Sequence, residues 1–240
     1  MARMAAVVLL LLPVFCSALP QAKFEAPQSQ FMRVAQTATQ YLNYHQGSPS
    51  YLRSVVFLGK TSVRNIPGVG HQYSVGFYTK HIQTGQNLGK CSATVLYRKK
   101  TSKPVIEISC TDNKDGDQIK EEDYSLYRKL QDTSSPDELK YFANIGSSYI
   151  AWKESTENVG YVMREIKDAK KWLRDNTLEF DYTVLIDSDI SKNLSCHMHI
   201  TWNLELPIKV KYECISEDTS AYGSGQESGS SPDYFFETNF

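Results

Sequence analysis

The sequence predicts an α+β protein that contains the same module twice, each copy being one long helix packed on a four-stranded antiparallel sheet. Three observations lead to this prediction. An apolar helix pattern occurs twice at a constant displacement, strand-like alternation follows each copy, and two cysteine pairs have nearly equal spacing. The chain has 240 residues, which is long enough for two such modules.

The helix pattern covers residues 31–45 and occurs again over 139–153. Apolar residues recur at i, i+3, i+4 and i+7, the spacing of an amphipathic helix with one buried face. Phe31, Val34, Ala35, Ala38, Tyr41 and Leu42 correspond, always at the same displacement along the chain, to Leu139, Phe142, Ala143, Gly146, Tyr149 and Ile150. Before the second helix, Ser135 suits the N-cap, Pro136 the first turn, and Glu138 the capping box.

Strand-like alternation follows each helix. Apolar residues occupy every second position in 91–97, 106–110, 196–202 and 208–214, as expected of half-buried strands. Tyr51 and Tyr161, and likewise Tyr73 and Tyr182, are taken as equivalent positions, because their displacements nearly match that of the helix pattern. A repeat of this length indicates a duplicated domain rather than a solenoid.

The cysteines predict one disulfide in each module. Cys16 lies in the N-terminal segment that we expect to be cleaved as a secretory signal. Cleavage leaves four cysteines, which are Cys91, Cys110, Cys196 and Cys214. Four cysteines allow three pairings. Nearly equal separations along the chain, and positions on the apolar faces of adjacent antiparallel strands, favour Cys91–Cys110 and Cys196–Cys214.

Residues 1–18 have the features of a secretory signal. Arg3 precedes an apolar run at Ala5–Phe15, and Cys16 and Ala18 are small residues before a cut after position 18. The run is shorter than the roughly 20 residues that a membrane-spanning helix needs. We therefore expect a secreted, extracellular protein without a membrane span, in a compartment that permits disulfides.

The domain organisation follows from these features. We expect a signal peptide at 1–18, module 1 at 19–115, a linker at 116–135, module 2 at 136–215 and a tail at 216–240. The charged linker predicts a short helix over 121–132 that touches both modules. The tail is rich in Ser and Gly and contains five carboxylates but no Lys or Arg, a composition that predicts disorder.

Composition and motifs argue against several functions. A formal net charge of -1 does not suit nucleic-acid binding through bulk positive charge. None of the five histidines lies in a nucleophile-elbow motif, the cysteines are assigned to disulfides, and the 13 glycines form no phosphate loop. We therefore expect neither an enzyme nor a cofactor.

Two motifs partly match metal sites. His197 and His199 share one face of a strand, but Lys209 and Lys211 occupy the outward face of the next strand and no carboxylate is evident nearby. A solvent-facing histidine pair is favoured.

Residues 111–122 partly match a calcium loop whose first position lacks the required Asp, so an acidic turn is favoured. Weak calcium contact by this turn and the tail stays open.

Four motifs resemble the latexin family, whose members are duplicated cystatin-like proteins. They are GHQYSVGFY (70–78), GKCSATVLY (89–97), YIAWKESTE (149–157) and LEFDYTVLI (178–186). The resemblance extends over about residues 24–214 and implies two cystatin-like modules joined by a linker helix. The signal and the four cysteines resemble the secreted branch of the family, which includes an avian eggshell matrix protein.

This resemblance implies an inhibitor of zinc metallocarboxypeptidases of the A/B type. Such an inhibitor covers the active-site funnel with the rims of both modules, the linker and a loop, which here is Asp187–Ser195. The implied contacts are Asp187, Ser191, Lys192 and Asn193. The alternative is a non-inhibitory extracellular protein of the eggshell type that assembles or protects a mineralised coat by binding matrix or mineral. Loop 187–195 and the linker look shorter than in latexin, so both functions stay open.

Two further motifs bear on inhibition. Asn193, Leu194 and Ser195 form an N-glycosylation sequon within the same loop. Residues 72–76, QYSVG, resemble the cystatin motif Gln-x-Val-x-Gly, but the Val is one position late. On a strand, a shift of one position turns the side chain to the other face, so no cysteine-protease wedge is predicted.

Overall fold

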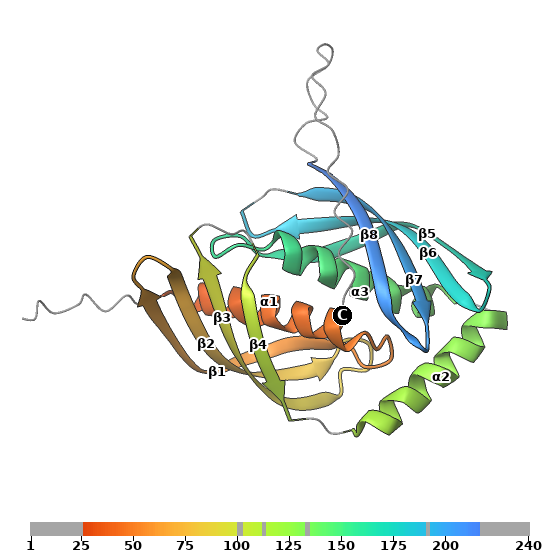
Figure 1. The fold of residues 1–240 in the computed structure, drawn as a ribbon, viewed down its shortest axis with the longest axis horizontal. Helices are drawn as coiled ribbons and strands as arrows, with labels where there is room; N and C mark the ends of the chain where they lie inside the picture. Colours follow the sequence, from red (N-terminus) through yellow and green to blue (C-terminus); the bar gives the residue numbers. More distant parts are fainter. Residues whose placement is uncertain (1–25, 100–102, 112–113, 133–134, 191–192, 217–240) are drawn as a thin grey trace, which may run out of the picture.

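The computed structural model describes residues 26–99, 103–111, 114–132, 135–190 and 193–216. It contains two four-stranded antiparallel sheets with strand orders β1-β2-β3-β4 and β5-β6-β7-β8. Figure 1 shows that helices α1 and α3 lie side by side between the two sheets, while α2 runs along one end of the molecule. The predicted duplicated α+β architecture is confirmed.

The elements follow one another in the same order in both halves. Module 1 contains α1 (Gln28–Gln46), β1 (Arg53–Ile66), β2 (Gly70–His81), β3 (Asn87–Arg98) and β4 (Val105–Cys110). The linker contains α2 (Gly116–Asp132). Module 2 contains α3 (Pro136–Glu154), β5 (Tyr161–Arg174), β6 (Thr177–Ser188), β7 (Leu194–Asn203) and β8 (Leu206–Ser216).

The duplication is closest in the helix and the first strand of each module. The displacement from α1 to α3 equals that from β1 to β5, at both ends of each element. Register shifts that mark β-bulges occur at Val55/Phe57 in β1 and at Met163/Glu165 in β5, again at this displacement. The two modules therefore share the same irregularities as well as the same elements.

The predicted tyrosine equivalences are wrong. Tyr161 begins β5, whereas Tyr51 lies two residues before β1. Strand β2 begins at Gly70 and β6 at Thr177, so the residue that corresponds to Tyr73 is Phe180. Both modules carry aromatic residues at neighbouring core positions, and matching by residue type therefore shifted the alignment.

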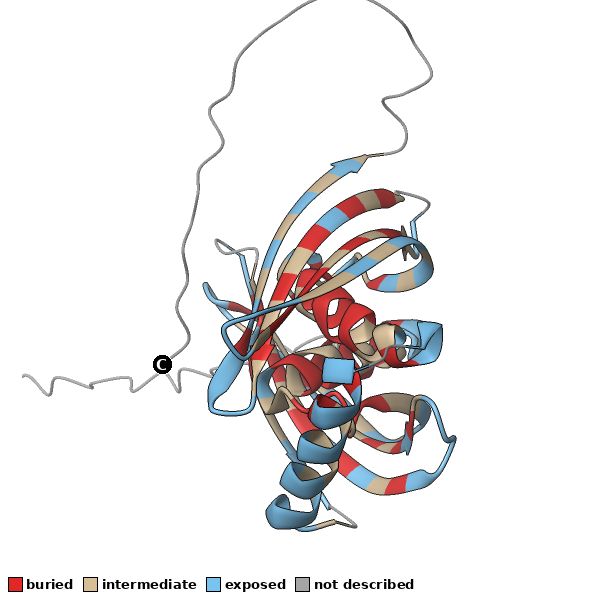
Figure 2. Ribbon diagram, turned by 90° about the vertical axis from the view of Figure 1, so that its right-hand side faces the viewer, coloured by how far each residue is buried: buried red, intermediate tan, exposed pale blue. Residues whose placement is uncertain are grey.

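The core lies on both sides of the helix pair. Figure 2 shows buried residues on the two central helices and, interspersed with exposed ones, along the strands of both sheets. Val34 and Ala38 of α1 and Phe142 of α3 are fully buried, as the helix pattern predicts. Between the helices, the Tyr44 and Tyr149 ring centroids lie 4.4 Å apart. The modules thus share one continuous core rather than two separate ones.

The start of α3 matches its sequence signature. The Ser135 hydroxyl accepts a hydrogen bond from Glu138 N at 3.3 Å, and the Glu138 carboxylate accepts one from Ser135 N at 2.9 Å. These contacts form the predicted capping box, with Pro136 in the first turn. A hydrogen bond from Lys129, at the end of α2, holds the pKa of Glu138 below its usual value. The cap therefore also ties the linker to module 2.

Helix α2 begins five residues earlier than predicted. It starts at Gly116 rather than at residue 121, because the Asp115 carboxylate accepts a hydrogen bond from Gln118 N at 2.8 Å and caps the helix. The acidic turn expected over 111–122 is consequently wrong for residues 116–122, which are helical. An aspartate three residues before a glutamine is a weak signal within a run of charged residues.

The linker helix touches both modules, as predicted. Asp123 Oδ1 accepts hydrogen bonds from the Ser48 hydroxyl at 3.0 Å and from the Ser50 hydroxyl at 2.6 Å. Burial raises the pKa of Asp123, while these serine hydrogen bonds act in the opposite direction. On the module 2 side, the Tyr127 and Trp202 ring centroids lie 5.5 Å apart. Helix α2 is therefore a strut with one polar and one aromatic attachment.

One disulfide crosses each sheet at its edge pair of strands. Cys91 and Cys110 are register partners on β3 and β4, with Cα atoms 4.0 Å apart. Cys196 and Cys214 are register partners on β7 and β8, with Cα atoms 4.1 Å apart. This is the pairing that the strand pattern favours.

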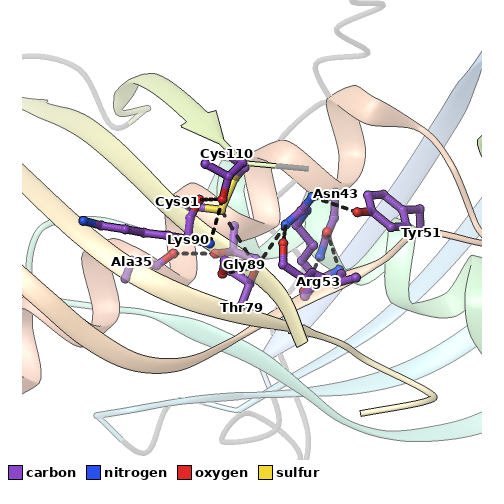
Figure 3. The surroundings of a disulfide bond; sticks show 12 residues. Ala35, Asn43, Tyr51, Arg53, Thr79, Gly89, Lys90, Cys91 and Cys110 are labelled. Carbon is purple, nitrogen blue, oxygen red and sulfur yellow. Dashed lines mark hydrogen bonds between the residues drawn. A yellow bond between two sulfur atoms is a disulfide. The ribbon is translucent and has the colours of Figure 1, made fainter. Parts of the chain in front are cut away.

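A buried arginine lies beside the first disulfide (Figure 3). Arg53 is 1% exposed, and its guanidinium donates to the Thr79 hydroxyl at 3.0 Å and to Leu88 O at 3.2 Å. Its backbone N–H donates to Asn43 Oδ1, and Asn43 Nδ2 donates to Arg53 O, both at 2.9 Å. Hydrogen bonding of this kind makes a buried charge tolerable and ties the end of α1 to β1.

We predict that Gly146→Val destabilises the protein because a Cβ atom at this position of α3 would lie 2.5 Å from Met198 Sδ and 2.7 Å from Ile200 Cδ1. Overpacking of a core costs about 1–3 kcal/mol. The melting temperature should fall by about 2–4 °C for each kcal/mol. Differential scanning calorimetry measures the effect.

The matched control is Gly116→Val, since a Cβ atom there would meet nothing within 4 Å. Met198→Ala should relieve the crowding, so the double variant Gly146→Val/Met198→Ala should lose less stability than the two single losses added together. Strict additivity would contradict the proposed packing.

Candidate functional site at the loop end of the two modules

Several connections gather at one end of the molecule, which we call the loop end. It comprises the β1–β2 turn at 67–69, the α3–β5 connection at 155–160 and the β6–β7 connection at 189–193. Contacts between the modules place these segments at the same end, because His71 Nδ1 at the start of β2 lies 2.8 Å from Glu157 Oε1, and Arg33 near the start of α1 forms an ion pair with Asp189. Both modules therefore contribute to this surface (Figure 1).

Loop 187–195 lies at this end, and the structure describes part of it. Asp187 is the second-last residue of β6, and its Oδ1 lies 3.1 Å from Arg164 Nη1 on the neighbouring strand. Asn193 is half-buried and directly precedes β7. Ser191 and Lys192, the other two implied contacts, lie outside the described residues.

Exposed apolar side chains accompany the loop. Ile190, within the loop, is 56% exposed, and Val69, in the β1–β2 turn, is 40% exposed. Ile215 of β8 is 66% exposed and is the register partner of Ser195. Large exposed apolar side chains at one end of a molecule can contribute to a contact surface.

A polar network joins the modules beneath the loop end. Glu157 Oε1, from the α3–β5 connection, accepts a hydrogen bond from the Tyr73 hydroxyl at 2.6 Å and lies 2.8 Å from His71 Nδ1. The Tyr73 hydroxyl in turn accepts from Gln30 Nε2 at 2.7 Å. Burial, together with the neighbouring Glu157 carboxylate, raises the pKa of Tyr73 far above its usual value. The phenol is therefore held neutral between the modules.

A second connection runs from α1 to the loop itself. Arg33 forms an ion pair with Asp189, and Arg33 Nη1 donates to Glu157 O at 3.0 Å. The sequence reasoning did not find these residues. Arg33 lies beside the apolar stripe of α1, where a charged residue is ordinarily read as solvent-facing, and nothing in the sequence connects it with a residue 156 positions later.

The linker helix does not belong to this surface. Tyr127 of α2 packs on Trp202, and Trp202 pairs with Leu178 near the beginning of β6. The loop follows the other end of β6, a strand of 12 residues, which corresponds to about 35–40 Å. Helix α2 therefore attaches at the end of β6 opposite the loop, and the implied contact of the linker with a protease stays a prediction.

The histidine motif has carboxylate neighbours, contrary to the prediction. His199 Nδ1 lies 2.8 Å from Asp181 Oδ1, and Nε2 lies 3.9 Å from Glu179 Oε2. Both carboxylates come from β6, the strand that pairs with β7 on the side away from the lysines. His197 is exposed and faces Glu213 in the register. Among the residues that the structure describes, no group of three or more His, Cys, Asp or Glu side chains could hold a metal ion.

In the partial calcium motif, the expected final ligand binds a lysine instead. Glu122, which would be its final ligand, binds Lys114 Nζ through both carboxylate oxygens at 2.6 and 2.7 Å.

The cystatin-like residues 72–76 lie in the interior of β2 and pair with β1 and β3. A strand that is paired on both sides cannot enter a protease cleft.

The fold and the loop end define a class of protein. Two antiparallel sheets, each covering one of two paired helices, with connecting loops from both modules at one end, are a duplicated cystatin-like arrangement. Within the described segments, no helix combines the length and apolar character needed to cross a membrane.

Comparison with known proteins identifies the family. The family described as latexin matches residues 24–141 and, in a second match, residues 133–220. Ovocalyxin-32 of Gallus gallus is 37% identical over 224 residues, covering 85% of this chain and 81% of its own length. Human retinoic acid receptor responder protein 1 is 29% identical and covers 85% of this chain and 78% of its own. Human latexin is 30% identical and covers 75% and 90%. The chain belongs to the latexin family.

We predict that Tyr73→Phe lowers the free energy of unfolding by about 1–3 kcal/mol at pH 8, because Glu157 loses a donor and Gln30 loses an acceptor. The folded-state pKa of Tyr73 is raised above its unfolded value of 10.0. The contribution of the neutral phenol is therefore fully present below pH 10 and is lost as the pH rises above it. Above pH 10, the difference in free energy of unfolding between wild type and Tyr73→Phe should narrow by about 1.4 kcal/mol per pH unit.

Urea unfolding between pH 8 and pH 11 measures this difference. Other buried tyrosines titrate equally in both proteins and cancel. Tyr124→Phe is the matched control, because the Tyr124 side chain is 52% exposed and its substitution removes no buried phenol. Parallel stability curves for wild type and Tyr73→Phe would show that the Tyr73 hydroxyl is not held neutral by the fold.

Proposed function

We propose that this protein is a secreted inhibitor of zinc metallocarboxypeptidases of the A/B type, and not an enzyme. It covers the active-site funnel with its loop end. Membership of the latexin family and 30% identity with human latexin support the proposal. The protein partner is then a metallocarboxypeptidase, and the inhibitor needs no cofactor of its own.

The observation that carries this proposal is the composition of the loop end. Ile190 from module 2 and Val69 from module 1 expose apolar side chains on connections that project from two rigid sheets. The Cys196–Cys214 disulfide lies two residues inside β7 and restrains the strand that carries the loop. A rim that is ordered before binding loses little conformational entropy on entering a funnel.

The proposed contacts are the four residues that the family resemblance implies. Asp187 and Asn193 lie at the two sides of the loop, and Ser191 and Lys192 are next to each other in its sequence. Asp187 forms an ion pair with Arg164 on β5. We propose that the loop reaches the protease through these side chains together with Ile190.

The remaining organisation is part of the same proposal. Residues 1–18 act as the signal peptide, and 19–115 and 136–215 form the modules on either side of the linker at 116–135. The two disulfides suit secretion into an oxidising, extracellular environment. The proposed signal peptide and the segment 217–240 lie outside the described residues.

Our first functional prediction concerns the sequon at Asn193. A glycan on this half-buried residue at the edge of β7 would add bulk at the mouth of the funnel. The unglycosylated protein should therefore inhibit carboxypeptidase A more strongly than the glycosylated form. The inhibition constant is measured for the secreted protein, for the same protein after glycan removal and for Asn193→Gln. Asn87→Gln is the surface control, because Asn87 is exposed at the start of β3, away from the loop end.

Three results are decisive. Stronger inhibition after glycan removal, matched by Asn193→Gln, would support the contact at this loop. Equal inhibition by all forms of a protein that carries the glycan would place loop 187–195 outside the interface. Absence of inhibition at micromolar concentration in every form would refute the inhibitor function.

A second candidate function is an extracellular matrix protein that assembles or protects a mineralised coat. The 37% identity with ovocalyxin-32 favours it, as do the five carboxylates in the tail sequence, which contains no Lys or Arg. Clustered carboxylates are hard oxygen ligands that suit calcium. This function would depend on the tail, whereas inhibition would depend on the loop.

We predict that deletion of residues 217–240 abolishes adsorption to calcium carbonate particles if the matrix function is correct. The melting temperature should change by less than about 5 °C, which corresponds to about 1–2.5 kcal/mol for a folded unit of this size. Sedimentation of the particles with bound protein measures adsorption, and an Asp/Glu-to-Asn/Gln variant of the tail serves as the charge control. Adsorption that survives deletion would assign mineral binding to the folded modules.

A further inference from the structure

Arg33 connects module 1 with the loop of module 2. It lies on α1, and its side chain is 17% exposed. Its Nε forms an ion pair with Asp189 Oδ2, and its Nη1 donates to Glu157 O at 3.0 Å. One guanidinium thus binds both the β6–β7 loop and the α3–β5 connection. Arginine suits this role, because its planar fork presents several donors in fixed directions.

The loop is held from a second side at the same residue. Asp189 Oδ1 accepts a hydrogen bond from Gly160 N at 3.0 Å, and Asp189 N donates to Gly160 O at 3.2 Å. The carboxylate of Asp189 therefore has one oxygen on module 1 and the other on module 2. Its backbone position and its side-chain position are both determined.

Gly160 provides independent evidence for this contact, because the absence of a side chain at position 160 leaves room for Arg33. A Cβ atom at residue 160 would lie 2.7 Å from Arg33 Cγ and 3.2 Å from Arg33 Cδ. The stem of Arg33 thus occupies the space that any larger residue at position 160 would need. Two features far apart in the sequence, a glycine and an arginine, are complementary in shape.

The geometry points to Arg33 as a positioning residue: module 1 determines the conformation of residues 187–190, where the loop leaves β6, through the Arg33–Asp189 ion pair and the packing of Arg33 on Gly160. This inference rests on the proposed inhibitory function, because it states how the protease-contacting loop is prepared before binding. A loop that is ordered beforehand loses less conformational entropy when the protease closes around it. Arg33 itself need not touch the protease.

Three variants test the inference. Arg33→Met keeps the stem on Gly160 and removes the charge, Gly160→Ala keeps the charge and displaces the stem, and Asp189→Asn removes the carboxylate. The matched control is Arg64→Met, since Arg64 is an exposed arginine of β1 that bonds Gln72 within its own module. Each protein is examined for carboxypeptidase A inhibition, for amide hydrogen exchange of residues 187–195 and for melting temperature.

We expect each of the three variants to raise the inhibition constant by about 10-fold, the order of effect of freeing one or two ordered groups. Exchange in 187–195 should accelerate, while exchange in the cores of β2 and β6 and the melting temperature stay near wild type. Arg33→Lys should restore part of the inhibition. The double variant Arg33→Met/Asp189→Asn should inhibit no more weakly than Arg33→Met alone, because Arg33→Met already removes the Arg33–Asp189 ion pair.

Hydrogen exchange separates failure of this inference from failure of the proposed function. Unchanged exchange of the loop in Arg33→Met would overturn the positioning role, whatever the inhibition data show. Accelerated exchange throughout both sheets, with a matching fall in melting temperature, would assign Arg33 to general stability and also overturn it. If the wild-type protein does not inhibit, the proposed function fails, and selective acceleration in 187–195 would still establish that Arg33 positions the loop.

Discussion

The packing of α1 against α3 is the contact on which the rest of the structure depends. A four-stranded sheet covers only one side of a helix, so each helix needs a second partner. The paired helix of the other module supplies it, through aromatic contacts such as Tyr44 with Tyr149 and Tyr41 with Trp152. The two modules are therefore halves of one folded unit, joined by a covered interface rather than by the linker alone.

The helix surfaces at this interface contain buried polar residues, which would be costly without partners. Thr37 and Thr39 of α1 are almost fully buried, and their hydroxyls donate to Arg33 O at 3.0 Å and Ala35 O at 2.8 Å within the same helix. Gln40 Nε2 crosses to module 2 and donates to Tyr161 O at 2.7 Å. Short polar side chains allow the helices to approach closely, and the few direct cross-module bonds fix their relative position.

This fixed position has consequences at both ends of the molecule. At the loop end, it brings Glu157 of module 2 to Tyr73 of module 1 and places Arg33 against the root of the β6–β7 loop. At the other end, α2 bridges the two modules, and the Asp123 carboxylate at this end accepts a hydrogen bond from the Ser50 hydroxyl. The loop end and the place of α2 are thus separate consequences of one helix pairing.

The sequence by itself determined the repeated unit and most of its interior. Apolar patterns with period 3.6 placed both long helices, and patterns with period 2 placed the third and fourth strands of each module. The capping box placed the start of α3, and inward-facing cysteines on adjacent strands gave the disulfide pairing. These features are local, because burial of one face of an element imposes a period on that element alone. Only the tertiary structure decided which loops meet. No sequence period connects the residues that form the Arg33–Asp189 pair, the packing of Arg33 on Gly160 and the contact of His199 with its carboxylates. The place of α2 at the far end depends on how one module is rotated against the other. Such contacts follow from the geometry of helix packing, which no single element encodes.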